Sequence, residues 1–229
     1  MGGPLGMVDI NTRQISSGNL AAMGSTFWTS RISADTGSTI LGGSRRGGSV
    51  VLATDGTDND ENQACFRGGK CVGAFAAGQS GRLVARIKGT EGNVDDQDWY
   101  IGFADVADTA DFFTDSDALA AAIDGIGFYK ISGSLFFRTA ALNASTNSAT
   151  GLTTTAYATG TDYDLEIRWS CLTAGMSIDF YVNGTLIDSV TGFSYTSLNA
   201  MYPCIILKNG GANAESLECS KFIFSNSAA

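Results

Sequence analysis

Acidic side chains are the residues of this sequence best suited to chemistry. Residues 55–61, with the sequence DGTDNDE, place several side-chain oxygens at short spacing, and hard cations such as calcium prefer oxygen ligands. Asp55, Asp58 and Asp60 are therefore the candidate metal ligands, and calcium is the cofactor they would suit. The alternative is a solvent-exposed turn in which Asp and Asn side chains hydrogen-bond to their own backbone. Because the run lacks the bidentate glutamate and the flanking helices of an EF-hand, both interpretations stay open.

The absence of histidine restricts what the chain can catalyse. Its 229 residues include 14 Lys and Arg, 23 Asp and Glu and no His, for a net charge of −9. Ser-His-Asp and Cys-His nucleophile systems and His-ligated metal sites are excluded. Carboxylate catalysis remains, and acids gather within residues 105–117 and alternate at Asp164 and Glu166. Neither group predicts the paired carboxylates that a glycosidase holds across a groove, so we expect no enzymatic activity.

Charge and cysteine content exclude further classes of protein. An acidic chain does not bind a nucleic-acid backbone non-specifically, and no apolar run approaches the ~18 residues of a membrane-spanning helix. The first residues show neither the basic nor the apolar region of a secretory signal. The five cysteines form no CxxC pair, so we expect free thiols, mostly buried, in a protein made in a reducing cytoplasm. Cys65 and Cys71 flank a short loop that is either bridged or simply joins two strands.

Two adjacent aromatic residues, Phe136 and Phe137, mark a candidate interface. Successive side chains of a β-strand point to opposite faces of the sheet. One of these two rings must therefore look away from the core, unless that face is also covered. An exposed aromatic ring favours a contact with a partner, so we expect an interface here rather than a small-ligand site.

Strands are expected along most of the chain. In residues 81–88 and 163–169, apolar and charged side chains alternate, which indicates half-buried strands, and residues 99–103 predict a central one. Asn183 and Gly184 separate two apolar runs, a strong signal for a type I′ hairpin. This turn would pair Val182 with Thr185 and Phe180 with Ile187. It would also place Asp179 opposite Asp188, a like-charge pair that needs a neutralising partner such as Arg168.

The ends of the chain and one acidic segment complete the expected organisation. Residues 1–24 are rich in Gly, Ser, Asn and Ala and predict an extended arm, with Leu5, Val8 and Ile10 available for contact with a neighbouring subunit. Residues 115–123 begin with acids and continue with Ala, Leu and Ile, a pattern typical of a short helix. Residues 25–229 would form one β-sandwich domain.

Two blocks of sequence resemble a known fold. Residues 81–138 contain the strings IGFADVADTADFF and DGIGFYK, and residues 163–184 contain YDLEIRW followed by IDFYVNG. Together they resemble the concanavalin A-like, or laminin-G-like, jelly roll, and the first block resembles virion structural proteins of tailed bacteriophages built on that fold. The resemblance covers about residues 45–225. It implies an all-β jelly-roll sandwich, to which the residue patterns described above add the N-terminal arm and one short helix. The Glu-x-Asp-x-x-Glu string of jelly-roll glucanases does not occur.

The resemblance implies a structural role on a virus particle. Our main expectation is a non-enzymatic head decoration, or cement, protein on the capsid surface, made in the host cytoplasm. Its partners would be the major capsid protein and further copies of itself in a homo-oligomer such as a trimer. The alternative is a carbohydrate- or receptor-binding module of a phage tail or fibre. Neither reading involves nucleic acid or a membrane.

Overall fold

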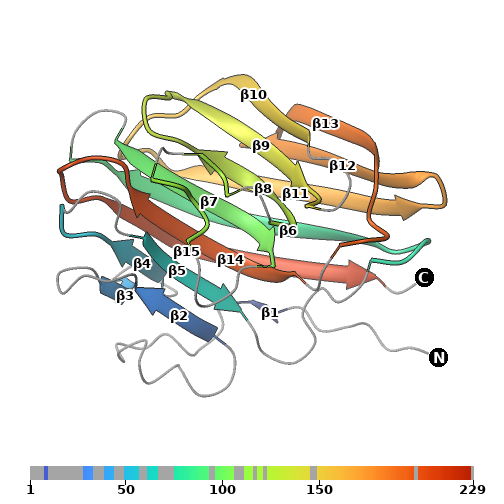
Figure 1. Cartoon of the computed structure of the whole chain (residues 1–229), viewed down its shortest axis with the longest axis horizontal. Helices are drawn as coiled ribbons and strands as arrows, with labels where there is room; N and C mark the ends of the chain where they lie inside the picture. Colours follow the sequence, from blue (N-terminus) through green and yellow to red (C-terminus); the bar gives the residue numbers. More distant parts are fainter. Residues whose placement is uncertain are drawn as a thin grey trace.

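Two antiparallel sheets hold the fifteen strands found in the described part of the chain. The structure is a computed structural model (Figure 1). It describes residues 8–9, 28–32, 39–43, 49–56, 61–66, 75–92, 96–105, 111–115, 118–120, 123–144, 149–198 and 201–227. None of these residues belongs to a helix long and apolar enough to cross a membrane.

Sheet A contains eight strands. Its order is β13 (Thr185–Phe193), β12 (Gly175–Val182), β11 (Tyr163–Leu172), β6 (Ser80–Thr90), β15 (Ser216–Ser227), β4 (Ser49–Ala53) and β3 (Thr39–Gly43), and β1 (Val8–Asp9) also pairs with β15. Val8 is opposite Phe224. Two residues of the segment expected as a separate arm therefore join the chain's own sheet.

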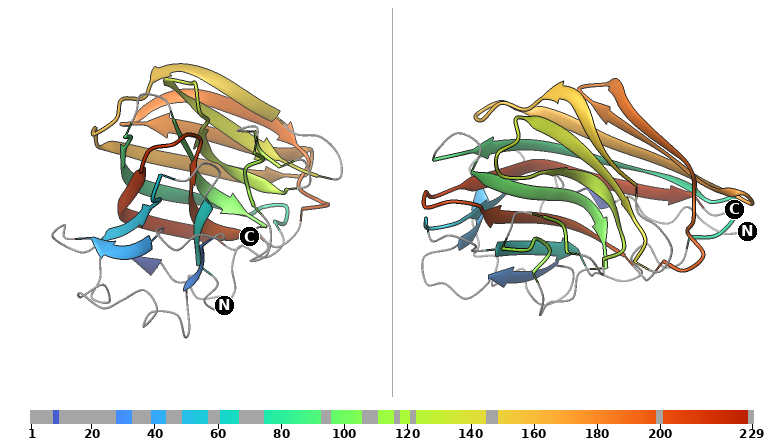
Figure 2. Two further views of the ribbon diagram at one scale, coloured as in Figure 1. Left: turned by 60° about the vertical axis from the view of Figure 1, so that its left-hand side comes forward. Right: turned by 45° about the horizontal axis from the view of Figure 1, so that its top comes forward.

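Sheet B contains seven strands. Its order is β10 (Ala149–Ala156), β9 (Phe136–Leu142), β8 (Gly125–Lys130), β7 (Gln97–Ala104), β14 (Tyr202–Asn209), β5 (Glu61–Phe66) and β2 (Trp28–Ile32). The two sheets lie over each other, with β10 and β13 at one side and β2 and β3 at the other (Figures 1 and 2). The fold is thus the two-layer sandwich that the strand pattern predicts.

The main core lies between the sheets. On β11, Tyr163, Leu165, Ile167 and Trp169 are all buried, whereas the residues between them are more exposed. This confirms the inner face expected from the alternation. Trp169 packs edge-on against Phe103 of β7, with ring centroids 5.1 Å apart, so the side chains of the two sheets interlock.

Sheet B is also covered on its outer face. Every residue of β7 and β8 is buried, and a second apolar cluster contains Tyr100, Cys65 and Cys204 together with Phe112 and Phe113. Residues 111–115 and 118–120 thus lie over this face, in the segment between β7 and β8. Burial on both sides explains why these strands are more uniformly apolar than β11.

The short helix expected at residues 115–123 is wrong for the part of it that the structure describes. Phe113 and Leu119 form an antiparallel bridge instead. The Thr114 N–H donates to the carbonyl of Ala118 at 2.7 Å, and the Ala120 N–H donates to the carbonyl of Phe112 at 2.9 Å. Burying the two phenylalanine rings against sheet B outweighs the helix propensity of the acidic start and the alanines.

The hairpin at Asn183 and Gly184 is confirmed, with φ values of 50° and 79° that a type I′ turn requires. Val182 pairs with Thr185 as expected, but Phe180 pairs with Asp188 rather than Ile187, because a register shift intervenes. The prediction that Asp179 lies opposite Asp188 is therefore wrong. Ser189 lies opposite Asp179 and donates to its carboxylate at 2.6 Å. Asp188 instead accepts a hydrogen bond from Thr139 of sheet B.

Candidate binding surface

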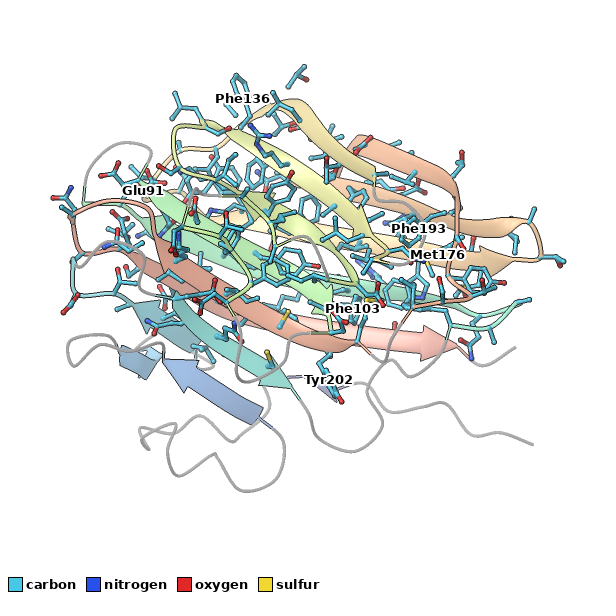
Figure 3. All side chains as sticks on the ribbon, in the orientation of Figure 1. Glu91, Phe103, Phe136, Met176, Phe193 and Tyr202 are labelled. Carbon is cyan, nitrogen blue, oxygen red and sulfur yellow. The ribbon has the colours of Figure 1, made fainter. Side chains whose placement is uncertain are left out.

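Phe136 and Phe137 point to opposite sides of sheet B, as the sequence predicts. Phe137 is fully buried and packs against Tyr163, with ring centroids 4.9 Å apart. The side chain of Phe136 is 40% exposed. Figure 3 shows it at the outer surface above β9, well away from the interior residues Phe103 and Met176. An aromatic ring is thus available for contact at the β9–β10 side of the sandwich.

Three further side chains extend this exposed surface. Leu135 precedes Phe136 and is 48% exposed, and Leu152 of β10 is 59% exposed. Arg138 is the register partner of Leu152. Its Nε is buried and has no hydrogen-bond partner among the described residues. We call Leu135, Phe136, Arg138 and Leu152 the β9–β10 patch.

The patch combines apolar area with a guanidinium group. An aromatic ring and two leucines offer a surface for apolar C–H groups, and a guanidinium offers planar donors to hydroxyl or carboxylate oxygens. The sequence analysis identified Phe136 but missed the other members. Leu152 did carry a signal, since it is the one large apolar residue among the small and hydroxyl side chains of β10.

The predicted cation site is only partly described. Asp55 follows β4 and is exposed, while Asp58 and Asp60 lie outside the described residues, as do Leu5 and Ile10 of the predicted interface. Within the part of the chain that the structure describes, no three His, Cys, Asp or Glu side chains are grouped to hold a metal ion. Calcium binding stays a prediction.

Glu61, the last residue of the acidic run, has a structural role that the sequence did not reveal. It is buried, and its carboxylate accepts hydrogen bonds from the backbone N–H groups of Phe112 at 2.8 Å and Phe113 at 2.9 Å. Burial raises the pKa of Glu61, although these hydrogen bonds oppose the rise. Lys208, directly opposite on β14, donates to the carbonyl of Thr114 at 2.8 Å. The two side chains thus fasten the covering segment to sheet B.

A second buried polar cluster lies at the end of the sandwich where Figure 3 labels Glu91. Lys130 forms an ion pair with Glu91, with 3.1 Å between Nζ and Oε1, and both side chains are buried. Glu215 is 2% exposed and accepts a hydrogen bond from the Gly92 N–H at 3.2 Å. Burial and the nearby charges of Glu91 and Asp96 raise the pKa of Glu215 to about 7. Its Oε2 has no hydrogen-bond partner among the described residues.

The alternating acids of β11 are engaged in surface ion pairs. Asp164 accepts two hydrogen bonds from Arg86 of β6, at 2.9 and 2.7 Å, which lower its pKa. Partial burial opposes a low pKa for Glu166, but hydrogen bonds from Arg168 and Arg82 outweigh it. Arg168 also lies over the ring of Tyr181, 4.4 Å from its centroid. Both carboxylates are therefore held ionised, whereas a general acid needs a raised pKa.

Comparisons with known proteins identify the fold. No family model and no curated protein matches the chain. Among solved structures, the endo-1,3-β-glucanase of Streptomyces sioyaensis has a TM-score of 0.63 and 10% identity, over 99% of this chain and 97% of the glucanase. The carbohydrate recognition domain of Emp47p has a TM-score of 0.55 and 11% identity, over 88% and 89% of the two chains.

A third similar structure comes from a larger protein. Botulinum neurotoxin type C, whose cell entry depends on interaction with two ganglioside molecules, has a TM-score of 0.54 and 12% identity. The match covers 86% of this chain but only 43% of the toxin chain. At such low identities these likenesses establish the jelly-roll sandwich alone.

Proposed function

We propose that this chain is a non-enzymatic carbohydrate-binding module, of the kind carried by a phage tail or fibre, and that the β9–β10 patch contacts the glycan. The observation that carries this proposal is the exposed ring of Phe136, which lies on the same face as Arg138 and its exposed register partner Leu152. A sugar ring presents an apolar C–H face and a rim of hydroxyls. The patch offers a complementary surface for each.

The similar structures support a binding role. They include a carbohydrate recognition domain and a toxin that interacts with gangliosides, besides a glucanase. Three carboxylates argue against a hydrolytic activity. Arginines keep Asp164 and Glu166 ionised, and the Glu61 carboxylate accepts hydrogen bonds from backbone N–H groups. Retaining and inverting glycosidases both need one carboxyl group that is protonated and one that is free to attack or to activate water.

The exposed leucines favour a second candidate function. Leu135 and Leu152 would suit a protein surface as well as a sugar. In that case the chain would be a capsid decoration protein on a virion, and the same patch would contact the major capsid protein or another copy of the chain. The two functions differ in what the Phe136 side chain touches, and one set of variants can separate them.

Binding to a glycan array tests the main proposal. The array should carry bacterial surface polysaccharides and β-1,3-glucan oligomers, and hits are quantified by calorimetry. We expect Phe136→Ala to weaken binding about 2- to 12-fold, since one aromatic contact contributes about 0.5–1.5 kcal/mol. Leu172→Ala, which trims a leucine that is 58% exposed on sheet A, is the matched control and should leave binding unchanged.

Three outcomes would overturn the proposal of a non-enzymatic glycan-binding module. The first is a glycan affinity that Phe136→Ala leaves intact, because the patch would then play no part. The second is the absence of any glycan ligand, together with a patch-dependent loss of capsid binding or of self-association measured by analytical ultracentrifugation. That result would establish the decoration function. Release of reducing sugar from the hits by the wild-type chain would show that the protein is an enzyme.

A further inference from the structure

Two cysteines of sheet B lie directly opposite each other. Cys65 of β5 and Cys204 of β14 are register partners in the antiparallel pair, and both are buried and free. Cys65 is also among the causes that raise the pKa of Cys204, which is consistent with two thiols that lie close together. The two sulfur atoms therefore face each other on the same side of the sheet, although the residues are far apart in the sequence.

This register matches the geometry that a disulfide needs. Directly opposed residues of an antiparallel pair have Cα atoms about 4.5 or 5.5 Å apart. A disulfide spans Cα separations of about 4.4–6.8 Å. The register of the two strands therefore suits a bridge between Cys65 and Cys204, which needs a rotation of the side chains and a small local adjustment of the backbone.

The other described cysteines have no such arrangement. Cys171 is opposite Met176 in the β11–β12 pair, and Cys219 is opposite Val50 in the β15–β4 pair and Ile87 in the β15–β6 pair. Both are buried among apolar side chains of the main core. They fit the expectation of inert buried thiols, whereas the pair in sheet B does not.

We propose that Cys65 and Cys204 form a redox modification site, which a small disulfide such as oxidised glutathione converts into a disulfide between strands β5 and β14. One cysteine thiolate attacks a sulfur of oxidised glutathione, which forms a mixed disulfide and releases one glutathione thiolate. The second cysteine thiolate then attacks the protein-bound sulfur and releases the other glutathione. The two cysteines lose two electrons in total, oxidised glutathione gains them, and the two thiol protons pass to the released glutathione thiolates.

The surroundings of the pair make this reaction slow in the folded chain. Both thiols are buried in the cluster that also contains Phe112 and Phe113, and burial raises the pKa of Cys204 well above its ordinary value. Thiolate, the reactive form, is therefore scarce. Oxidation requires local opening of the segment around Phe112. The disulfide would therefore form during prolonged exposure to an oxidising environment and not during a brief one.

Mass spectrometry of the glutathione-treated full chain tests the site. The protein is equilibrated with oxidised glutathione in the native state and, in parallel, refolded in a buffer of reduced and oxidised glutathione. Free thiols are then blocked before digestion. We expect a linked peptide joining Cys65 to Cys204, and a rise in thermal midpoint of roughly 5–10 °C, because the bridge closes a long loop.

Paired variants serve as controls. Cys65→Ala should abolish both the linked peptide and the oxidation-dependent rise in midpoint, whereas Cys171→Ala should retain both. The proposal is overturned if the Cys65–Cys204 peptide is absent from both the native and the refolded samples, or if Cys65 is found linked to Cys71 instead. A rise in midpoint that persists in Cys65→Ala would also overturn it.

Discussion

At the scale of single residues, the packing of Trp169 explains a glycine of the neighbouring strand. Gly81 is the register partner of Trp169, and a Cβ placed on Gly81 would lie 2.0 Å from the Trp169 ring. The ring fills this space and packs edge-on against Phe75, with centroids 6.3 Å apart. The two positions therefore act as one large–small pair across the strands.

We predict that Trp169→Ala costs about 3–5 kcal/mol of unfolding free energy, because it leaves a cavity in a closely packed core. Gly81→Ala should also destabilise the fold, since the indole must move or the strands must separate. Urea unfolding followed by circular dichroism measures both effects. Thr154→Ala, a change at an exposed position of β10, serves as the control. Midpoints for the two core variants that match this control would contradict the packing described here.

The same residues show how far the sequence could predict the fold. The inner face of β11 could be predicted because apolar and charged residues alternate along this strand with a period of two. Glu61 and Lys208 pair across strands that are remote in the sequence, and no local pattern encodes that register. Their burial also contradicts the usual preference of charged residues for solvent. Sequence reasoning therefore found Phe136, whose neighbour Phe137 gave the signal, but not the charged residues that fasten the covering segment.

At the scale of elements, the turn of the β12–β13 hairpin is a place where a substitution affects the backbone conformation without affecting side-chain packing. Gly184 has a φ of +79°, and a Cβ added there would contact nothing within 4 Å. Any cost of a substitution at this position therefore comes from the backbone conformation. The register shift two residues further on was not predictable from the turn. The shifted Asp188 accepts a hydrogen bond from Thr139 of the other sheet, a contact between strands that no local pattern encodes.

We predict that Gly184→Val destabilises the protein by about 1–3 kcal/mol, since a β-branched residue rarely adopts positive φ. Gly184→Asn should cost much less, because Asn tolerates this region of the backbone. Thermal unfolding of both variants provides the comparison. Equal losses in the two would show that the turn is not of the type I′ geometry.

At the scale of the whole molecule, buried carboxyl groups make stability depend on pH. The pKa of Glu215 is about 7 in the folded chain, against a usual value of 4.5. The folded state thus binds this proton more tightly than the unfolded state does. Stability contributed by the protonated group is present below about pH 4.5 and is lost as the pH rises to about 7. Glu61, whose pKa is also raised, acts in the same direction.

We predict that Glu215→Gln is less sensitive to pH than the wild type between pH 5 and 8. The two pKa values correspond to at most about 3 kcal/mol, so the variant should gain stability relative to wild type toward pH 8. Chemical unfolding at several pH values measures this difference. The lowered pKa values of Asp164 and Glu166 act below their usual range, outside this window. Parallel stability curves for the two proteins would refute the assignment.

The order of the strands has a consequence for how the chain is made. The last two strands, β14 and β15, occupy inner positions: β14 lies between β7 and β5, and β15 between β6 and β4 (Figure 1). Until the ribosome has released residues 201–227, both sheets are incomplete. The edges of β4 and β6 that pair with β15, and the edges of β5 and β7 that pair with β14, then have no partner.

We predict that a chain ending at residue 200 shows no cooperative unfolding in calorimetry. Refolding of the full chain should be slow, in milliseconds to seconds, as for other sheets built from distant contacts. Synthesis therefore leaves an interval in which nascent strands can pair wrongly with those of another copy, and a chaperone that shields these strands would raise the yield of folded protein.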